Sequence, residues 1–279
     1  MITELFGVSA ADAAVDWTAV VEGRTCPFLR RECLKTRKSD PSVAIGSCSA
    51  SVGKAGPTVL CPHRLLERGI IFSDALPLLQ LHEAGNEIHL VREVEIPGGN
   101  VDYFLISTRE RKVMDFVGIE LQTLDSTGSI WPQRQEFLRA HGVSLLDEEF
   151  ENSNFGLNWK MTAKTILMQL HHKLQTFENL NKKLVLVLQT PLLNYMRSNF
   201  SFGHLALPPR LGDALHFHAY DFHQRGVGFE ISFEERLSTD VAGIAQCLGL
   251  NANPNIELEA MYEILAAKIN DDTVFRLSS

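Results

Sequence analysis

Residues 87–122 read EIHLVREVEIPGGNVDYFLISTRERKVMDFVGIELQ, and this stretch decides the fold. Hydrophobic residues alternate well enough over 87–96 to predict a strand, and the Pro-Gly-Gly-Asn sequence at 97–100 is a strong turn signal. Two further strands are predicted over 101–107 and 113–122, joined by a short charged connection. Strands joined by such short connections pair with their neighbours. The sequence therefore predicts a three-stranded antiparallel meander.

The segments on either side of the meander are those of an α/β protein. A helix is predicted over 74–84, and a long helix over 157–177, where hydrophobic residues recur at steps of three and four. The continuous hydrophobic run at 183–189 is short enough to be a central strand that is buried on both faces. Further strands are predicted at 215–222 and 227–233. We therefore expect a mixed sheet flanked by helices.

The composition is that of a folded, water-soluble protein. Of the 279 residues, 45% are hydrophobic and 22% are charged, which excludes disorder as a description of the whole chain. The first residues lack the basic start and apolar core of a signal peptide, and no apolar run approaches the roughly 20 residues that span a bilayer. We therefore expect an intracellular, cytoplasmic protein.

Charge is distributed unevenly along the chain. Between Arg24 and Arg64, eight basic residues stand against two acidic ones, Glu32 and Asp40, which is a balance of +6, whereas the whole chain carries −8. The basic stretch predicts an N-terminal face that is suited to a polyanion. A solvated basic face without a function accounts for the charge equally well.

Four of the five cysteines lie in the first 61 residues, at Cys26, Cys33, Cys48 and Cys61. Clustered thiols in an intracellular protein indicate a metal before they indicate disulfides, and four thiolates satisfy a tetrahedral ion. The spacing is not that of paired Cys-x-x-Cys motifs, so unpaired thiols or an oxidised pair remain alternatives. Zinc is the default ion and iron is chemically equivalent in a closed site, where it would be structural. Cys247 lies in a hydrophobic context and is predicted to be a buried core thiol.

Two acidic residues of the meander are candidates for a metal site. Gly118, Glu120 and Gln122 share one face of their strand, and an ionised Glu in an apolar strand is costly to bury unless it is paired or bound to a cation. Asp102 begins the neighbouring strand, where the meander brings it beside Glu120. Two converging carboxylates suit Mg²⁺, which activates water and neutralises charge on a phosphodiester. Alternatively, both acids are ordinary residues of a turn and of an edge strand.

An Asp followed in the next strand by Glu-x-Lys is the nuclease motif written PD-(D/E)xK, with Gln122 here in the place of Lys. Gln122 can hydrogen-bond a water molecule but supplies no charge. Further short motifs occur in order along the chain: Phe6-Gly7, Cys26-Pro27-Phe28-Leu29, Cys33, Cys48, Cys61-Pro62-His63-Arg64, Asp102, Glu120-Leu121-Gln122-Thr123, Gly128-Ser129 and Trp159-Lys160-Met161-Thr162. In these motifs the chain resembles the NotI-type type II restriction endonucleases, over about residues 5–170.

The resemblance implies a restriction-endonuclease-like PD-(D/E)xK domain over 69–279, preceded by a small Cys₄ domain over 1–68 that carries iron or zinc. It implies Mg²⁺-dependent cleavage of double-stranded DNA at a specific, palindromic sequence, leaving 5′-phosphate and 3′-hydroxyl ends. The implied catalytic residues are Asp102 and Glu120 on the metal, Gln122 at the attacking water and Glu87 as a further acidic residue. Lys160 is a candidate for the missing positive charge, with a surface lysine as the alternative.

The predicted DNA contacts are chosen by their place in the sequence and by their side-chain chemistry. Arg30, Arg31, Lys35 and Arg64 lie on or beside the loops that the Cys₄ site would hold. Gln133, Arg134 and Gln135 follow the catalytic strand and have side chains that can read purine edges. Palindromic targets favour a homodimer, with a cognate DNA methyltransferase as a functional partner in a prokaryotic cytoplasm.

Two other classes of function compete with this interpretation. The first is a non-catalytic DNA-binding protein with a Cys₄ module and a vestigial nuclease core. The second is an iron–thiolate redox protein, which leaves the paired carboxylates unexplained. His216 and His218 share a strand face and suggest a further metal cluster, but a polar strand face is the expected explanation.

Overall fold

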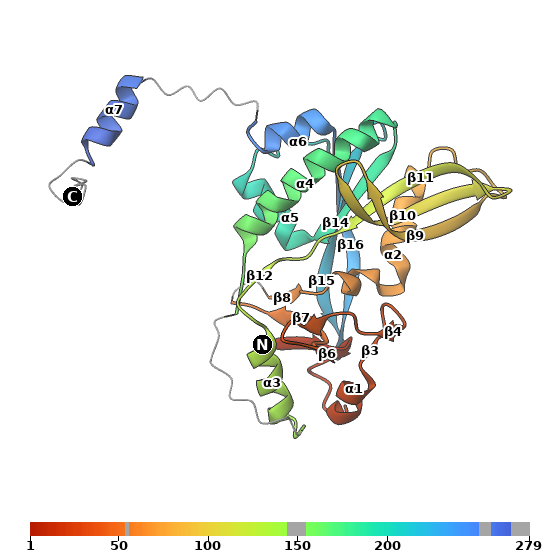
Figure 1. The fold of residues 1–279 in the computed structure, drawn as a ribbon, viewed down its shortest axis with the longest axis vertical. Coiled ribbons are helices and arrows are strands. Elements are labelled where there is room, and N and C mark those ends of the chain that lie inside the picture. The colour runs from red at the N-terminus through yellow and green to blue at the C-terminus, as the bar shows by residue number, and fades with distance from the viewer. Residues whose placement is uncertain (54–55, 144–154, 251–257, 269–279) are drawn as a thin grey trace, which may run out of the picture.

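The computed structural model describes residues 1–53, 56–143, 155–250 and 258–268. Its centre is a six-stranded mixed sheet in the order β16-β15-β14-β11-β10-β9 (Figure 1). The strands are β9 (Glu87–Ile96), β10 (Gly99–Arg109), β11 (Lys112–Leu121), β14 (Lys183–Gln189), β15 (Leu215–Arg225) and β16 (Gly228–Thr239). The predicted meander is confirmed, because β9, β10 and β11 pair antiparallel in sequence order.

The turn between β9 and β10 fixes the register of this meander. Ile96 pairs with Gly99, so the turn consists of Pro97 and Gly98. Gly98 has a φ of +101°, which favours glycine. A Cβ at this position would also lie 2.7 Å from the carbonyl oxygen of His172 in the helix beneath. The turn therefore packs directly on that helix.

The strand β14 forms the centre of the sheet, as predicted. All seven of its residues are buried, and it pairs in parallel with both β11 and β15. Parallel neighbours need long crossover connections. Here they contain α4 (Trp159–Asn179) and α5 (Thr190–Asn199).

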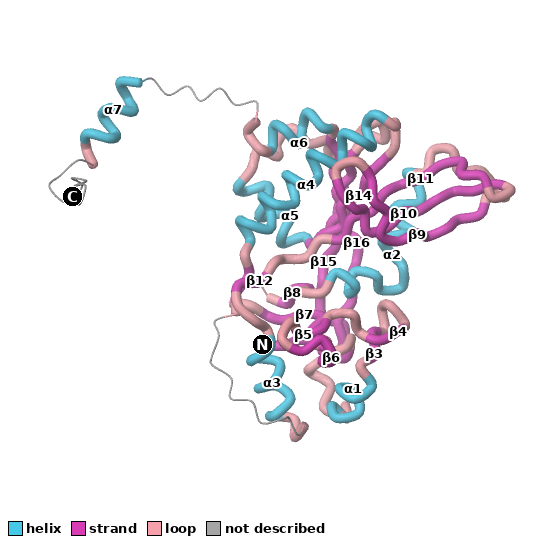
Figure 2. Tube along the Cα trace, viewed as in Figure 1, coloured by secondary structure: helices cyan, strands magenta, loops and turns pink. Residues whose placement is uncertain are grey.

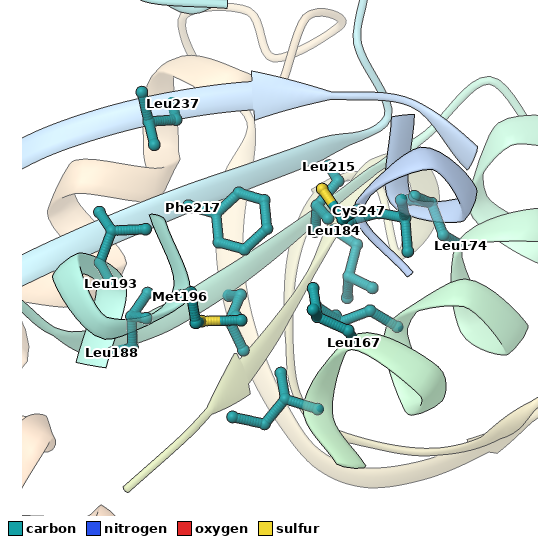
Figure 3. Packing of buried hydrophobic residues seen from close by; sticks show 14 of the residues in the cluster. Leu167, Leu174, Leu184, Leu188, Leu193, Met196, Leu215, Phe217, Leu237 and Cys247 are labelled. Atoms are coloured by element: carbon teal, nitrogen blue, oxygen red, sulfur yellow. The ribbon is translucent and has the colours of Figure 1, made fainter. Parts of the chain in front are cut away.

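Helices cover both faces of the central sheet. On one face, α4, α5 and α6 (Val241–Cys247) pack on β14 and β15 around Leu167, Leu174, Met196 and Phe217 (Figure 3). Cys247 lies in this core, as predicted. The other face is covered by the helical segment η1 (Pro62–Gly69) and by α2 (Ile70–Ala75).

The N-terminal part has its own sheet, in the order β2-β1-β7-β8. Figure 2 labels two of its strands, β7 and β8. The elements of this part are β1 (Ile2–Leu5), β2 (Val8–Ser9), α1 (Trp17–Gly23), β3 (Thr25–Cys26), β4 (Arg31–Glu32), β5 (Thr36–Arg37), β6 (Asp40–Ala44), β7 (Ser47–Ser51) and β8 (Pro57–Val59). The later helix α3 (Trp131–Ala140) shares its hydrophobic cluster, in which Leu138 and Trp17 are buried. A division at residue 68 stays a prediction, and hydrophobic contacts cross it.

The helix predicted over 74–84 is wrong. The helical turns in this region come earlier, in η1 and α2, and end with the short segment η2 (Leu76–Leu78). Pro77 lies inside the predicted range, and proline lacks the N–H that a continuing helix needs. The remaining elements are β12 (Ser126–Thr127), β13 (Gly156–Leu157) and α7 (Leu258–Ala266). Within the described residues, no helix is both long and apolar enough to cross a bilayer.

Candidate active site

Three carboxylates form a row across the meander. Tyr103 pairs with Ile119 on β11 and with Arg92 on β9, so the register places the preceding residue, Asp102, between Glu120 and Glu93. Residues directly opposite each other on adjacent strands point to the same face of a sheet. The two predicted metal ligands, Asp102 and Glu120, are therefore brought together.

Asp102 is half-buried at the start of β10, and its Oδ2 accepts a hydrogen bond of 2.8 Å from the backbone N–H of Leu121. Burial raises the pKa of the Asp102 carboxyl, and the Leu121 hydrogen bond opposes this shift. Within the described chain, no donor reaches Oδ1. The side chain is thus fixed by one oxygen while the other remains available.

Glu120 forms an ion pair with Lys173 of α4, with 2.6 Å between Oε1 and Nζ. The two side chains are 14% and 11% exposed, so the pair is largely removed from water. Burial raises the pKa of Glu120 to about 7; Lys173 opposes the shift and Asp102 adds to it. A further cation beside Glu120 would therefore stabilise the ionised form of its carboxyl.

Gln122 follows Glu120 on the same face, beyond the end of β11. Its backbone N–H donates to the carbonyl of Val187, and its Nε2 donates to the carbonyl of Thr123 at 2.8 Å. These bonds orient the amide and leave Oε1 to accept a hydrogen bond from a water molecule.

A cavity of about 110 Å³ adjoins the carboxylate row. Its lining includes the acidic residues Asp102 and Glu93 and the basic or titratable residues Arg31, His63 and Arg92. Burial, Arg31 and Arg92 together lower the pKa of His63, in that order of effect. Basic and acidic side chains thus line the same cavity, a combination suited to a phosphate group beside a cation.

The predicted Glu87 is not brought to this row. It pairs with Thr108 at the far end of β9, and it contacts His89 at 3.4 Å. Glu93 is six positions further along the strand, about 20 Å at 3.3 Å per residue. The exposed Glu93 occupies the place that sequence reasoning gave to Glu87. Counting the register back through the two-residue turn identifies Glu93 from the sequence.

Lys160 is also distant from the carboxylates. It is exposed in the first turn of α4, thirteen residues before Lys173, which is about 20 Å along a helix. The cation at Glu120 is therefore Lys173, which sequence reasoning missed.

The four N-terminal cysteines are brought to one cavity of about 10 Å³, which His63 and Lys35 also line. Burial raises the pKa of the Cys48 and Cys61 thiols. The Cys48 thiol lies 3.4 Å from the carbonyl of Gly46, and the Cys61 thiol lies 3.8 Å from His63 Nδ1. As the side chains stand, no three His, Cys, Asp or Glu residues in the described chain form a group that could hold a metal ion. The donor types fit a thiolate-bound metal here and Mg²⁺ at the carboxylates, but a bound ion requires the side chains to move closer.

Three of the predicted DNA contacts are buried. Arg64 is 1% exposed and donates to Glu4, to Glu67 and to the carbonyl of Phe229 at 2.7–2.9 Å. Its role is to join the N-terminal sheet to β16. Arg134 donates to the carbonyl of Ile45 and, as a second buried contact, to Gln135 Oε1.

Burial of the Arg134 guanidinium lowers its pKa to about 10. Gln133 is half-buried on the same helix. In contrast, Arg30 and Arg31 are exposed, and Lys35 is half-buried with its Nζ donating to the carbonyl of Leu60. Of the predicted contacts, Arg30, Arg31 and Lys35 are therefore the ones that DNA can reach most directly.

An open groove of about 870 Å³ lies beside this surface. Its lining includes Lys35, residues Arg37 and Lys38 of the β5–β6 hairpin that follows it, Ser129, and Trp131, the first residue of α3. The Arg37 guanidinium lies 4.7 Å from the centre of the Trp131 ring, close enough for a cation–π contact. Sequence reasoning counted Arg37 and Lys38 as basic residues but assigned them to no site.

His216 and His218 do not form a polar surface face, because both are fully buried. Burial lowers the pKa of His216 to about 4 and that of His218 to about 2. Phe233 packs edge-on against His218. Both imidazoles are therefore neutral core residues of β15.

Comparison with known proteins gives one family. A family model described as restriction endonuclease NotI matches residues 24–225, which is more than half of the chain. The matched range contains the four clustered cysteines, the carboxylate row and Lys173. No curated protein matches the chain.

Proposed function

Because the chain belongs to the NotI restriction endonuclease family, we propose that it is a type II enzyme that cleaves double-stranded DNA at a palindromic site with the help of Mg²⁺. The observation that carries the proposal is the carboxylate row of Glu93, Asp102 and Glu120 within the matched range. An iron–thiolate redox protein would not require these three carboxylates.

The chain's own residues define the chemistry. Asp102 and Glu120 would hold the divalent ion through their free oxygens, with Glu93 as the third carboxylate. The ion, when bound, supplies a water of lowered pKa and neutralises charge on the phosphodiester. Gln122 Oε1 would orient the attacking water. Water oxygen bonds to phosphorus, the bond to the 3′ oxygen breaks, and a proton passes to that oxygen, which leaves a 5′-phosphate and a 3′-hydroxyl.

The basic residues around the row would hold the DNA. Arg31 and Arg92 line the 110 Å³ cavity together with Asp102, and there they would contact the scissile phosphate. Arg30 and Lys35 would add phosphate contacts. The 870 Å³ groove would receive base edges, with Arg37 as the reading side chain and the exposed Lys38 as a phosphate contact at its rim.

The four cysteines would bind a structural iron or zinc ion at their shared cavity. Such an ion would tie β3, β7 and the start of η1 together and thereby fix the loops that carry Arg30, Arg31 and Lys35. Elemental analysis of purified protein tests this assignment: one equivalent of iron or zinc supports it, and the absence of both contradicts it.

Cleavage assays test the proposed reaction. Wild-type protein with plasmid DNA and Mg²⁺ should give discrete fragments, whose sequenced ends define the site and the cut. A palindromic site also predicts a homodimer, measured by sedimentation. In a prokaryotic cytoplasm, a methyltransferase of the same specificity would protect the host DNA.

The alternative function is a non-catalytic DNA-binding protein with a vestigial nuclease core. It predicts site-specific binding without cleavage at any Mg²⁺ concentration. Specific fragments from the wild type exclude it.

A further inference from the structure

Lys173 lies in the buried face of α4 and points to the carboxylate row. Its Nζ is 2.6 Å from Glu120 Oε1, and its side chain is 11% exposed. Arg31 and Arg92, the other cations beside the row, are exposed. Burying a lysine is costly unless it is paired, so this position is held by the carboxylate that it contacts.

The β9–β10 turn holds this part of α4 in place. Thr176 donates a hydrogen bond of 2.7 Å to the carbonyl of Pro97. Cβ atoms at Gly98 and Gly99 would lie 3.1 Å from Lys173 Cα and 3.3 Å from its Cε. The turn that sets the register of Asp102 against Glu93 thus also sets the position of Lys173.

The position of the nuclease motif that usually holds a lysine supplies no positive charge to offset the carboxylate row. Three carboxylates lie side by side, and Gln122, two residues after Glu120, is neutral. Water attack on a phosphodiester adds negative charge at the same place, and fixed cations stabilise it. Lys173 is the buried cation that contacts the row.

We propose that Lys173 is a positioning residue for cleavage: from α4 it places beside Glu120 the positive charge that Gln122, just after β11, does not carry. It holds Glu120 through one oxygen and leaves the other oxygen for the divalent ion. This inference rests on the proposed function. It assigns to a helix the role that the lysine of the nuclease motif has on the strand.

Two other roles for Lys173 are distinguishable. As a purely structural ion pair, it would be replaceable by an apolar residue of similar volume without loss of cleavage. As a substitute for the metal, it would compete with Mg²⁺, and its removal would leave the cleavage rate unchanged or raise it.

The experiment compares Lys173→Met with Lys173→Arg and with the double variant Gln122→Lys, Lys173→Met. Lys164→Met is the matched control, because Lys164 lies on the same helix and is exposed. Measurements are kcat and KM on a DNA duplex containing the wild-type cleavage site, Mg²⁺ affinity of the DNA-free protein by titration calorimetry, and melting temperature.

Lys173→Met should lower kcat about 100-fold, as expected for a misplaced catalytic group, with little change in KM. It should bind Mg²⁺ at least as tightly as wild type, because a like charge has gone. The double variant should regain at least about tenfold in kcat, since the cation returns on the strand. Lys173→Arg should fall between the two, and Lys164→Met should match wild type.

An unchanged or raised kcat in Lys173→Met overturns the inference, as does a joint loss of kcat and Mg²⁺ binding that Gln122→Lys does not restore. If Lys173→Met fails to fold, Lys173→Gln, whose amide can still hydrogen-bond Glu120, takes its place in the single and the double variant: a lowered kcat that Gln122→Lys raises again supports the inference, and an unchanged kcat overturns it. Absence of cleavage by the wild type contradicts the proposed function instead, so the two failures are separable.

Discussion

β14 and β9 belong to the same sheet but have opposite surroundings. Every residue of β14 is buried, whereas β9, at the edge of the sheet, is exposed along most of its length. Apolar contacts at the centre of the sheet therefore stabilise the fold. The meander at its edge can carry charged side chains, because water reaches them. Substitutions in the two regions should accordingly separate folding from cleavage.

The largest expected effect is at Asp102. Asp102→Asn removes a proposed metal ligand but keeps an oxygen for the Leu121 N–H, so cleavage should fall on the order of 1,000-fold. The free energy of unfolding should change by less than about 1 kcal/mol, because a repulsion with Glu120 is relieved as well.

Glu87→Gln is the matched control on the meander and should cleave like wild type. Fragment yield and urea unfolding measure the two effects. Equal cleavage by Asp102→Asn and wild type would show that the carboxylate row is not the site.

The opposite result is expected in the centre of the sheet. Leu184→Ala opens a cavity beneath α4, where Leu184 is fully buried, and should cost about 3 kcal/mol of unfolding free energy. At a temperature where the variant stays folded, kcat should remain near wild type. A stability loss below about 1 kcal/mol would contradict the packing described for this face.

Lowering the pH should also reduce the free energy of unfolding through a residue of the core. The pKa of His218 is lowered to about 2 by burial, against about 6.5 in an unfolded chain. Below pH 6.5 the unfolded chain binds a proton that the folded chain does not, so stability falls as pH falls, by about 1.4 kcal/mol per pH unit.

His218→Phe should remove this contribution. The difference in unfolding free energy between wild type and variant, measured at pH 7 and pH 5, isolates it from Glu120, which titrates in the opposite direction. An identical pH dependence in both proteins would mean that His218 is not a neutral buried residue.

The smallest effect is expected at the rim of the groove. Lys38 is exposed, so Lys38→Ala should weaken DNA binding modestly and reduce the slope of log affinity against log salt by about 1. Lys112→Ala, at the far end of the meander, is the control and should leave the slope unchanged. Binding anisotropy over a salt series tests whether the groove lies on the DNA path.

Local sequence patterns were sufficient to predict the meander and the central strand of the sheet. The meander and β14 follow from alternation, from one turn and from a short apolar run, all of which act between neighbours in sequence. The helix predicted over 74–84 is wrong because Pro77 cannot continue a helix, whatever the spacing of the hydrophobic residues around it. Asp102 and Glu120 meet because a meander fixes which residues lie opposite each other.

The rest of the site depended on contacts between distant segments. Glu93 was predictable in principle, by carrying the register through the Pro97–Gly98 turn. Lys173 also left a signal, since it continues the buried stripe of Ile166 and Leu170 at the next helical step. Burial of Arg64 left none, because its partners Glu4 and Phe229 are far apart in the sequence.

Arg64 therefore has a consequence for where the enzyme would cut. Its guanidinium fastens β1 to β16 through Glu4 and the Phe229 carbonyl, while Glu67 receives both Arg64 and the N–H of Ile231. Arg64 thus fastens the N-terminal sheet to the central sheet that carries the proposed cleavage site. This joint would help to fix the number of base pairs between the recognised bases and the cleaved bond. Without the Arg64 contacts that number would vary, and cleavage would occur at more than one position.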